Sequence, residues 1–256
     1  MGSEPTTFRP TPDHLAPALT EREQIVLLAR ALWHEGYDDH LAGHITVNQG
    51  DGTLLCNPWL LTWEEFEPDD VIRIDLEGNV LEGEWPAPLG IPLHLELHKA
   101  RPGIGWALHH HSRWGTVWAD MKRVPPIHDQ TAAGGGGQLV LVDEYDGNVG
   151  DANAAAKAVE KMGDADLALL AHHGVFVLGV NVNAVYWRAA SLEWRCRNAW
   201  LVEQGGGGPG VPQVVHDTFG RSDGTRFTGY WETAVRRELR RDPDLAARIG
   251  MAGAAN

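Results

Sequence analysis

Two groups of histidines in this chain have the residue type and the spacing of a metal site. The segment His109-His110-His111 follows the apolar run 104–108, which is typical of a buried strand. Side chains alternate along a strand, so His109 and His111 are expected on one face and His110 on the other. The second group, His172-His173, lies between two further apolar runs, where another strand begins or ends. The sequence therefore predicts a divalent metal held by His109, His111 and His173, with a position left open for water or substrate.

A histidine is more often a hydrogen-bonded core residue than a metal ligand, and a chain with 13 histidines can contain a chance run of them. The metal interpretation is favoured because both groups flank apolar, strand-like runs. Zinc is the expected ion, with iron and manganese as alternatives.

Alternating helix and strand signals surround these histidines. Thr20 and Glu23 form a capping box, and Asp51-Gly52 is a hairpin signal. Helices are expected over 20–36, 91–100, 113–121, 151–162 and 183–203, strands over 44–48, 53–57, 71–75, 80–81 and 139–142, and a glycine-rich loop over 131–137. This pattern predicts an α/β fold: a three-layer α/β/α arrangement with a central mixed, largely antiparallel sheet covered by helices.

Composition limits the function classes. A chain of 256 residues with 43% hydrophobic content suits one sizeable domain, here predicted over 20–205 between an N-terminal arm, 1–19, and a C-terminal helical tail, 206–256. The net charge of −14 argues against nucleic acid and anionic membranes as partners. With 2 cysteines and neither a signal peptide nor a membrane-length apolar run, a cytoplasmic location is expected.

Several motifs in this order resemble the class II aldolase/adducin head-domain family. They are Gly43-His44-Ile45-Thr46, Asp75-Leu76-Glu77-Gly78-Asn79, Pro92-Leu93-His94, Ala100-Arg101-Pro102, His109-His110-His111-Ser112 and His173-Gly174. The resemblance covers roughly residues 20 to 205 and is specific to the superfamily, not to one substrate. It implies a nine-stranded sheet between helical layers, a zinc-type cation on His109, His111 and His173, and a homotetramer.

Three positions depart from the aldolases of that family. The position of their acid/base glutamate is Gly90 here, and the positions of two phosphate-binding serines are Pro88 and Leu89. The loop 127–131 has no tyrosine, although such a residue often donates a proton in the family. These departures argue against the phosphosugar mechanism and against recognition of a phosphate.

Another group must therefore move the proton. His94 is the first candidate, because it lies one helical turn from position 90 and an imidazole titrates near neutrality. Equally, His94 could be a buried residue that orients a ligand. Asp129 and His128 are weaker candidates. Candidate substrate-binding residues are Gly43, His44, Thr46, Gly90, Gln130 and Trp114.

Three functions follow. The leading one is a metal-dependent, aldehyde-lyase-like enzyme, a class II aldolase-like lyase that cleaves or forms a C–C bond next to a carbonyl in a small oxo or hydroxy compound. The second is a non-haem iron oxygenase/decarboxylase acting on an aromatic 2-oxo acid, since three neutral histidines also suit ferrous iron. The third is a non-catalytic, adducin-like interaction module.

Overall fold

One sheet of eight strands forms the centre of the protein. The computed structural model describes residues 15–143, 151–219 and 229–254. Along the sheet the strand order is β4-β3-β2-β1-β5-β8-β7-β6, and every neighbouring pair is antiparallel except β6 and β7. The strands are β1 His44–Asn48, β2 Thr53–Cys56, β3 Ile72–Asp75, β4 Val80–Glu82, β5 Trp106–His110, β6 Leu139–Val142, β7 Leu167–Leu170 and β8 Gly174–Gly179.

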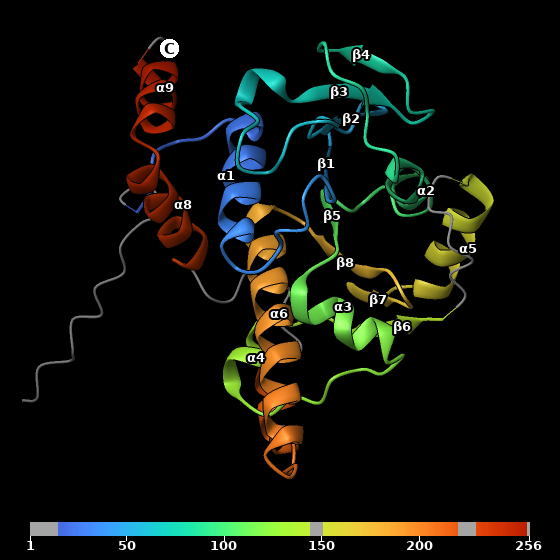
Figure 1. Ribbon diagram of the computed structural model, residues 1–256. Helices are drawn as coiled ribbons and strands as arrows, with labels where there is room; N and C mark the ends of the chain where they lie inside the picture. The colour runs from blue at the N-terminus through green and yellow to red at the C-terminus, as the bar shows by residue number, and fades with distance from the viewer. Residues whose placement is uncertain (1–14, 144–150, 220–228, 255–256) are drawn as a thin grey trace, which may run out of the picture.

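Helices cover both faces of this sheet. They are α1 Glu21–Trp33, the short 3₁₀ helix η2 Pro68–Asp70, α2 Ile91–Ala100, α3 Arg113–Asp120, α4 Gln130–Gly134, α5 Ala152–Met162, α6 Val182–Gln204, α7 Gln213–Phe219, α8 Tyr230–Arg241 and α9 Pro243–Ala254. Figure 1 shows α2 and α5 on one side of the strands and α1 and α6 on the other. The predicted three-layer fold with a mixed, largely antiparallel sheet is confirmed. The described residues form eight strands rather than the nine that the resemblance implied.

Alternation along β5 assigns its side chains to two separate cores. Ala107 packs with residues of α2 and α5, whereas Leu108 packs with residues of α1 and α6. By the same alternation His109 shares the α2/α5 face with Ala107, and His110 shares the α1/α6 face with Leu108. Neighbouring residues of one strand therefore lie in different environments.

Local sequence signals account for most helix boundaries. The predicted capping box begins α1, because the Thr20 hydroxyl accepts a hydrogen bond from the Glu23 backbone N–H and the Glu23 carboxylate accepts one from Thr20. The predicted glycine-rich loop is partly wrong, since α4 occupies residues 130–134. Its first turn is stabilised by Asp129, whose side chain accepts a hydrogen bond from the Ala132 N–H.

The C-terminal segment contains α7, α8 and α9, and α8 packs on α1 and α6. Val235 of α8 and Leu245 of α9 are buried in the core on the α1/α6 face. The predicted boundaries near residues 19 and 205 stay predictions, and most of the predicted N-terminal arm, 1–14, lies outside the described residues. Among the described helices, none has both the length and the apolar character needed to cross a membrane.

Candidate metal centre

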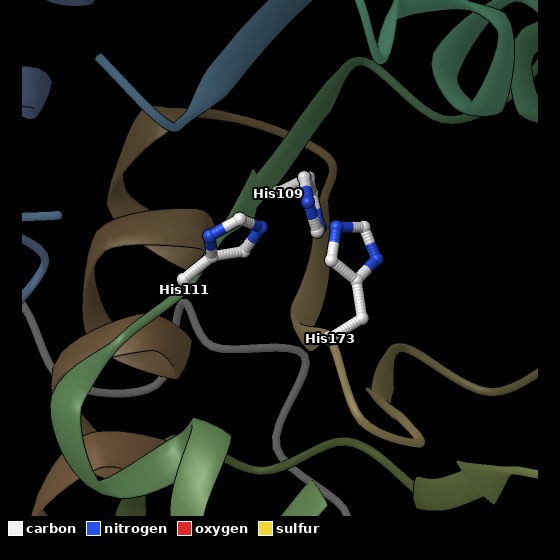
Figure 2. A group of neighbouring side chains, drawn as sticks. All are labelled: His109, His111 and His173. Atoms are coloured by element: carbon white, nitrogen blue, oxygen red, sulfur yellow. The ribbon is translucent and has the colours of Figure 1, made fainter. Parts of the chain in front are cut away.

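The structure brings together the three histidines that the sequence singled out. His109 lies at the end of β5, His111 directly follows that strand, and His173 lies in the turn between β7 and β8. One ring nitrogen from each side chain lies within 4.8 Å of the other two. Figure 2 shows the three rings facing a common space. This spacing suits nitrogen ligands at about 2.0–2.1 Å from one cation.

Hydrogen bonds to Nδ1 fix two of these rings. His109 Nδ1 lies 2.9 Å from the backbone oxygen of Val175 in β8, and His111 Nδ1 lies 2.8 Å from the Asp39 carboxylate. Each Nδ1 donates its proton to an oxygen, so each Nε2 keeps a lone pair for a cation. Histidine ligands of metals commonly have such oxygen partners, and the donor set fits a divalent ion such as zinc.

Burial keeps the imidazoles of His109 and His173 neutral. Burial, together with the smaller effect of the neighbouring His111, lowers the pKa of His173 to about 3. The pKa of His109 lies well below its usual value for the same reasons, burial first and the nearby histidines second. A neutral imidazole is the form that binds a metal.

Asp39 is an acidic side chain in contact with His111 of the triad, and the sequence analysis missed it. Partial burial acts to raise the pKa of this carboxyl, but hydrogen bonds from His40 and His111 outweigh it and lower the pKa overall. Asp39 is separated from His111 by 72 positions, and no motif marks it in the sequence.

His110 points away from the triad, as alternation predicts. Its ring centroid lies 4.4 Å from that of Trp63 and 5.6 Å from that of Tyr37, both in the core on the α1/α6 face. The side chain is fully buried, and burial lowers its pKa to about 3. His110 therefore contributes to packing.

A second group of polar side chains connects α2 to the sheet beside the triad. The Thr46 hydroxyl lies 2.8 Å from His94 Nδ1 and 2.9 Å from His98 Nε2. Thr46 and His94 are fully buried. His94 is therefore buried between α2 and the sheet, and its predicted role as proton carrier stays a prediction.

Gly43, His44 and Gly90, which were predicted to bind substrate, have different neighbours. Gly43 needs its lack of a side chain, since its φ is +117° and a Cβ there would lie 2.3 Å from the His110 ring. His44 and Gly90 are in contact on the α2 side of the triad.

Asp129 and His128 lie in the loop between α3 and α4, where their hydrogen-bond partners belong to other segments than the triad. The Asp129 carboxylate caps α4 and also accepts hydrogen bonds from Trp194 Nε1 and Asn198 Nδ2. His128 Nδ1 lies 3.2 Å from the backbone oxygen of Pro209. Within the described residues, no hydrogen bond or ring contact joins Asp129 or His128 to the triad, and their catalytic roles stay predictions.

Gln130 is the first residue of α4, and Trp114 lines a cavity of about 410 Å³ that the triad does not line. The same cavity is lined by Glu193, which is buried in α6 and accepts hydrogen bonds from the backbone N–H groups of Trp114 and Gly115. Burial raises the Glu193 pKa to about 7. Substrate binding by Gln130 and Trp114 stays a prediction.

Comparison with known proteins identifies the family. Residues 23–200 match the family described as "Class II Aldolase and Adducin N-terminal domain". The chain belongs to this family.

Three curated relatives illustrate its chemistry. A 4-hydroxy-3-prenylphenylpyruvate oxygenase/4-hydroxy-3-prenylbenzoate synthase from Streptomyces roseochromogenus is 27% identical, over 83% of this chain and 79% of the relative. A 5-methylthioribulose-1-phosphate/5-deoxyribulose-1-phosphate aldolase from Rhodospirillum rubrum is 30% identical, over 68% of this chain and 80% of the relative. A 3,4-dihydroxyphthalate decarboxylase from Arthrobacter keyseri is 32% identical, over 73% of this chain and 80% of the relative.

A solved L-fuculose 1-phosphate aldolase from Glaciozyma antarctica has the same fold, with a TM-score of 0.73 and 21% identity over 94% of this chain and 96% of that one. The family and its aldolase and decarboxylase relatives make this chain an enzyme of the aldolase-like lyase type, as the sequence predicted. The oxygenase and the non-catalytic module are not favoured, although one relative bears the oxygenase name.

Proposed function

We propose that this enzyme holds a divalent cation on His109, His111 and His173 and cleaves or forms a C–C bond next to a carbonyl. The observation that carries the proposal is the convergence of the three ring nitrogens within 4.8 Å, with two of the rings fixed by hydrogen bonds at Nδ1. The substrate is a small oxo or hydroxy compound. The resemblance to the family places phosphate-binding serines at positions 88 and 89, and Pro88 and Leu89 stand there instead, so the substrate need not carry a phosphate.

A bound cation would supply positive charge next to the substrate oxygen on which negative charge develops as the bond breaks. The protein residues perform the remaining tasks. Asp39 orients His111, and the Val175 backbone oxygen orients His109, so the two Nε2 atoms stay in place. Substrate binding is assigned to the α2 side of the triad, at His44 and Gly90, with the buried Thr46 holding His94 and His98 beside them.

Finer features belong to the same proposal. Zinc is the expected metal because it accepts three histidines with an open fourth position, and iron and manganese are the alternatives. A homotetramer and a cytoplasmic location are what the family resemblance and the cysteine content favour.

The first test of this function is metal content. Protein purified without chelators is measured by inductively coupled plasma mass spectrometry, alongside His109→Ala, His111→Ala and His173→Ala. We expect about one zinc per chain in the parent and almost none in the variants, since losing one of three protein ligands leaves too few. Metal retained in all three variants would contradict the proposed centre.

The second test is turnover. The zinc, iron and manganese forms are assayed with a panel of small hydroxy and oxo compounds, by chromatographic detection of cleavage products. Metal-dependent C–C cleavage is the expected result. Oxygen consumption by the iron form alone would favour the oxygenase instead, and a loaded enzyme that turns over no compound in any form would count against both.

A further inference from the structure

The backbone conformation of Gly90 does not explain why this residue is a glycine. Its φ of −86° and ψ of 9° are accessible to ordinary residues, so no conformational strain requires glycine here. A Cβ at this position would instead lie 2.2 Å from Cε1 and 3.0 Å from Nδ1 of His44. The His44 ring therefore fills the space that a side chain at position 90 would need.

His44 lies next to the proposed metal centre. It is the direct cross-strand partner of His109, so the two side chains share one face of the sheet. Their ring centroids are 5.4 Å apart. Only 6% of His44 is exposed, and its buried Nδ1 has no hydrogen-bond partner among the described residues. A buried polar atom without a partner is costly, which suggests that a bound molecule satisfies it.

Side chains of α2 and β1 hold the His44 ring in position. The His94 ring packs edge-on against His44, with centroids 5.7 Å apart. Thr46 holds His94 at Nδ1 and also bonds His98. Since the hydroxyl of Thr46 has one proton to donate, it donates to one imidazole and accepts from the other, which fixes both rings. His94 is thus a positioning residue for His44.

The charges around His44 indicate which kind of ligand it contacts. An imidazole carries at least one N–H donor in either of its common protonation states. The ring neighbours of His44 are the imidazoles of His94 and His109. Among the described residues, the Asp39 carboxylate contacts the triad at His111 Nδ1. A doubly charged cation with neutral ligands favours a ligand that brings its own negative charge.

We propose that His44 is a substrate-contacting residue of this enzyme, that Gly90 leaves room for it, and that it donates a hydrogen bond to a carboxylate of the substrate. The inference rests on the proposed function, because it places the substrate at the triad. It specifies the substrate class as small hydroxy or oxo acids. The corresponding neutral compounds lack the charge that the site selects.

The test uses glycolate and glycolamide, which differ in a carboxylate and an amide. Binding to the zinc-loaded full chain is measured by isothermal titration calorimetry. We expect glycolate to bind at least about tenfold more tightly than glycolamide. His44→Ala is expected to weaken glycolate binding about tenfold to a hundredfold, since a hydrogen bond to a charged group is lost. Its zinc content and its weak glycolamide binding are expected to stay near the parent values.

Four further variants separate the loss of a substrate contact from a loss of stability. Gly90→Ala is expected to lower both the melting temperature and glycolate affinity, because its methyl group displaces the His44 ring. In the double variant His44→Ala/Gly90→Ala the melting temperature is expected to recover, but glycolate binding is not. His44→Gln, which keeps an N–H donor, is expected to retain part of the affinity. His34→Ala, in the turn after α1, is the histidine control and is expected to match the parent in glycolate affinity and zinc content.

Three outcomes would overturn the inference alone. The first two are full zinc content with unchanged glycolate affinity in His44→Ala, and equal affinity of the parent for glycolate and glycolamide. Recovered glycolate binding in the double variant would overturn it as well. A parent protein that takes up no zinc, iron or manganese would overturn the proposed function and this inference together.

Discussion

His109 and His110 are neighbours in β5 and are both buried, yet they belong to different parts of the molecule. On the α2/α5 face, His109 has a defined partner at Nδ1 and meets two other histidines. On the α1/α6 face, His110 is surrounded by the aromatic rings of Trp63 and Tyr37.

The difference shows what separates a ligand from a packing residue. Burial lowers the pKa of both imidazoles, so neither burial nor neutrality identifies a metal site. The distinguishing features are the oxygen that fixes the tautomer of His109 and the convergence of ring nitrogens from separate segments. The predictions below test this contrast.

The largest effect is expected for the ligands. Replacing His109, His111 or His173 with alanine should lower zinc affinity and any C–C lyase activity by at least about a thousandfold, since a histidine ligand is removed outright. Zinc affinity is measured by competition with a chromophoric chelator, and folding is checked by circular dichroism. A well-folded variant that keeps parental affinity would refute the assignment of that residue.

His110→Ala should show the opposite profile. We expect a loss of about 2–4 kcal/mol in the free energy of unfolding, because a buried ring is removed and leaves a cavity. Zinc content should stay unchanged. The free energy is measured by urea denaturation of the metal-free protein. Zinc loss without destabilisation would reverse the roles given to His109 and His110.

The pH dependence of stability tests the α1/α6 face. The folded state binds the proton of Glu193 more tightly than the unfolded state does, because its pKa is raised from 4.5 to about 7. This group therefore lowers the free energy of unfolding as pH rises from about 5 to about 7, by up to about 3 kcal/mol. Buried neutral histidines act in the opposite direction from about pH 3 to about pH 6.5, which overlaps this range, so the difference between the parent and Glu193→Gln isolates the effect. A difference that does not change over this pH range would contradict it.

Asp39→Asn tests the support of His111. The amide cannot accept the Nδ1 proton as a carboxylate does, so zinc affinity should fall about tenfold to a hundredfold. Asp38→Asn is the matched neighbour, since Asp38 pairs with Arg113 instead. Equal losses in the two variants, in the same chelator competition, would indicate a general charge effect.

The smallest effect is expected for Thr46→Val, which keeps the shape but removes the hydroxyl shared by His94 and His98. Two buried ring nitrogens then lose their partner, at a cost of about 1–2 kcal/mol in the free energy of unfolding. Zinc content should be retained. The loss is measured by urea denaturation, and a Thr46→Val protein as stable as the parent would argue against this role.

Much of the fold follows from local patterns. The period of two along β5 separates His109 from His110, and the Thr20–Glu23 capping box locates the start of α1. The short helix α4 was missed because its glycines and alanines indicate a loop, whereas Asp129 stabilises its first turn.

The site is less readable from the sequence than the fold. Its three proposed ligands lie in apolar, strand-like surroundings that the pattern marks. No sequence pattern marks the contacts that orient these ligands, because Asp39 is brought to His111 by the packing of distant segments. The fit of His44 against Gly90 likewise depends on the pairing of β1 with β5 and on the position of α2, which no local motif specifies.

The most direct test of the central claim is anomalous diffraction at the zinc edge from crystals of the zinc-loaded protein. We predict one strong peak at about 2.0–2.1 Å from a ring nitrogen of each of His109, His111 and His173. A zinc peak at another place in the fold, or none near these rings in fully loaded protein, would contradict the account.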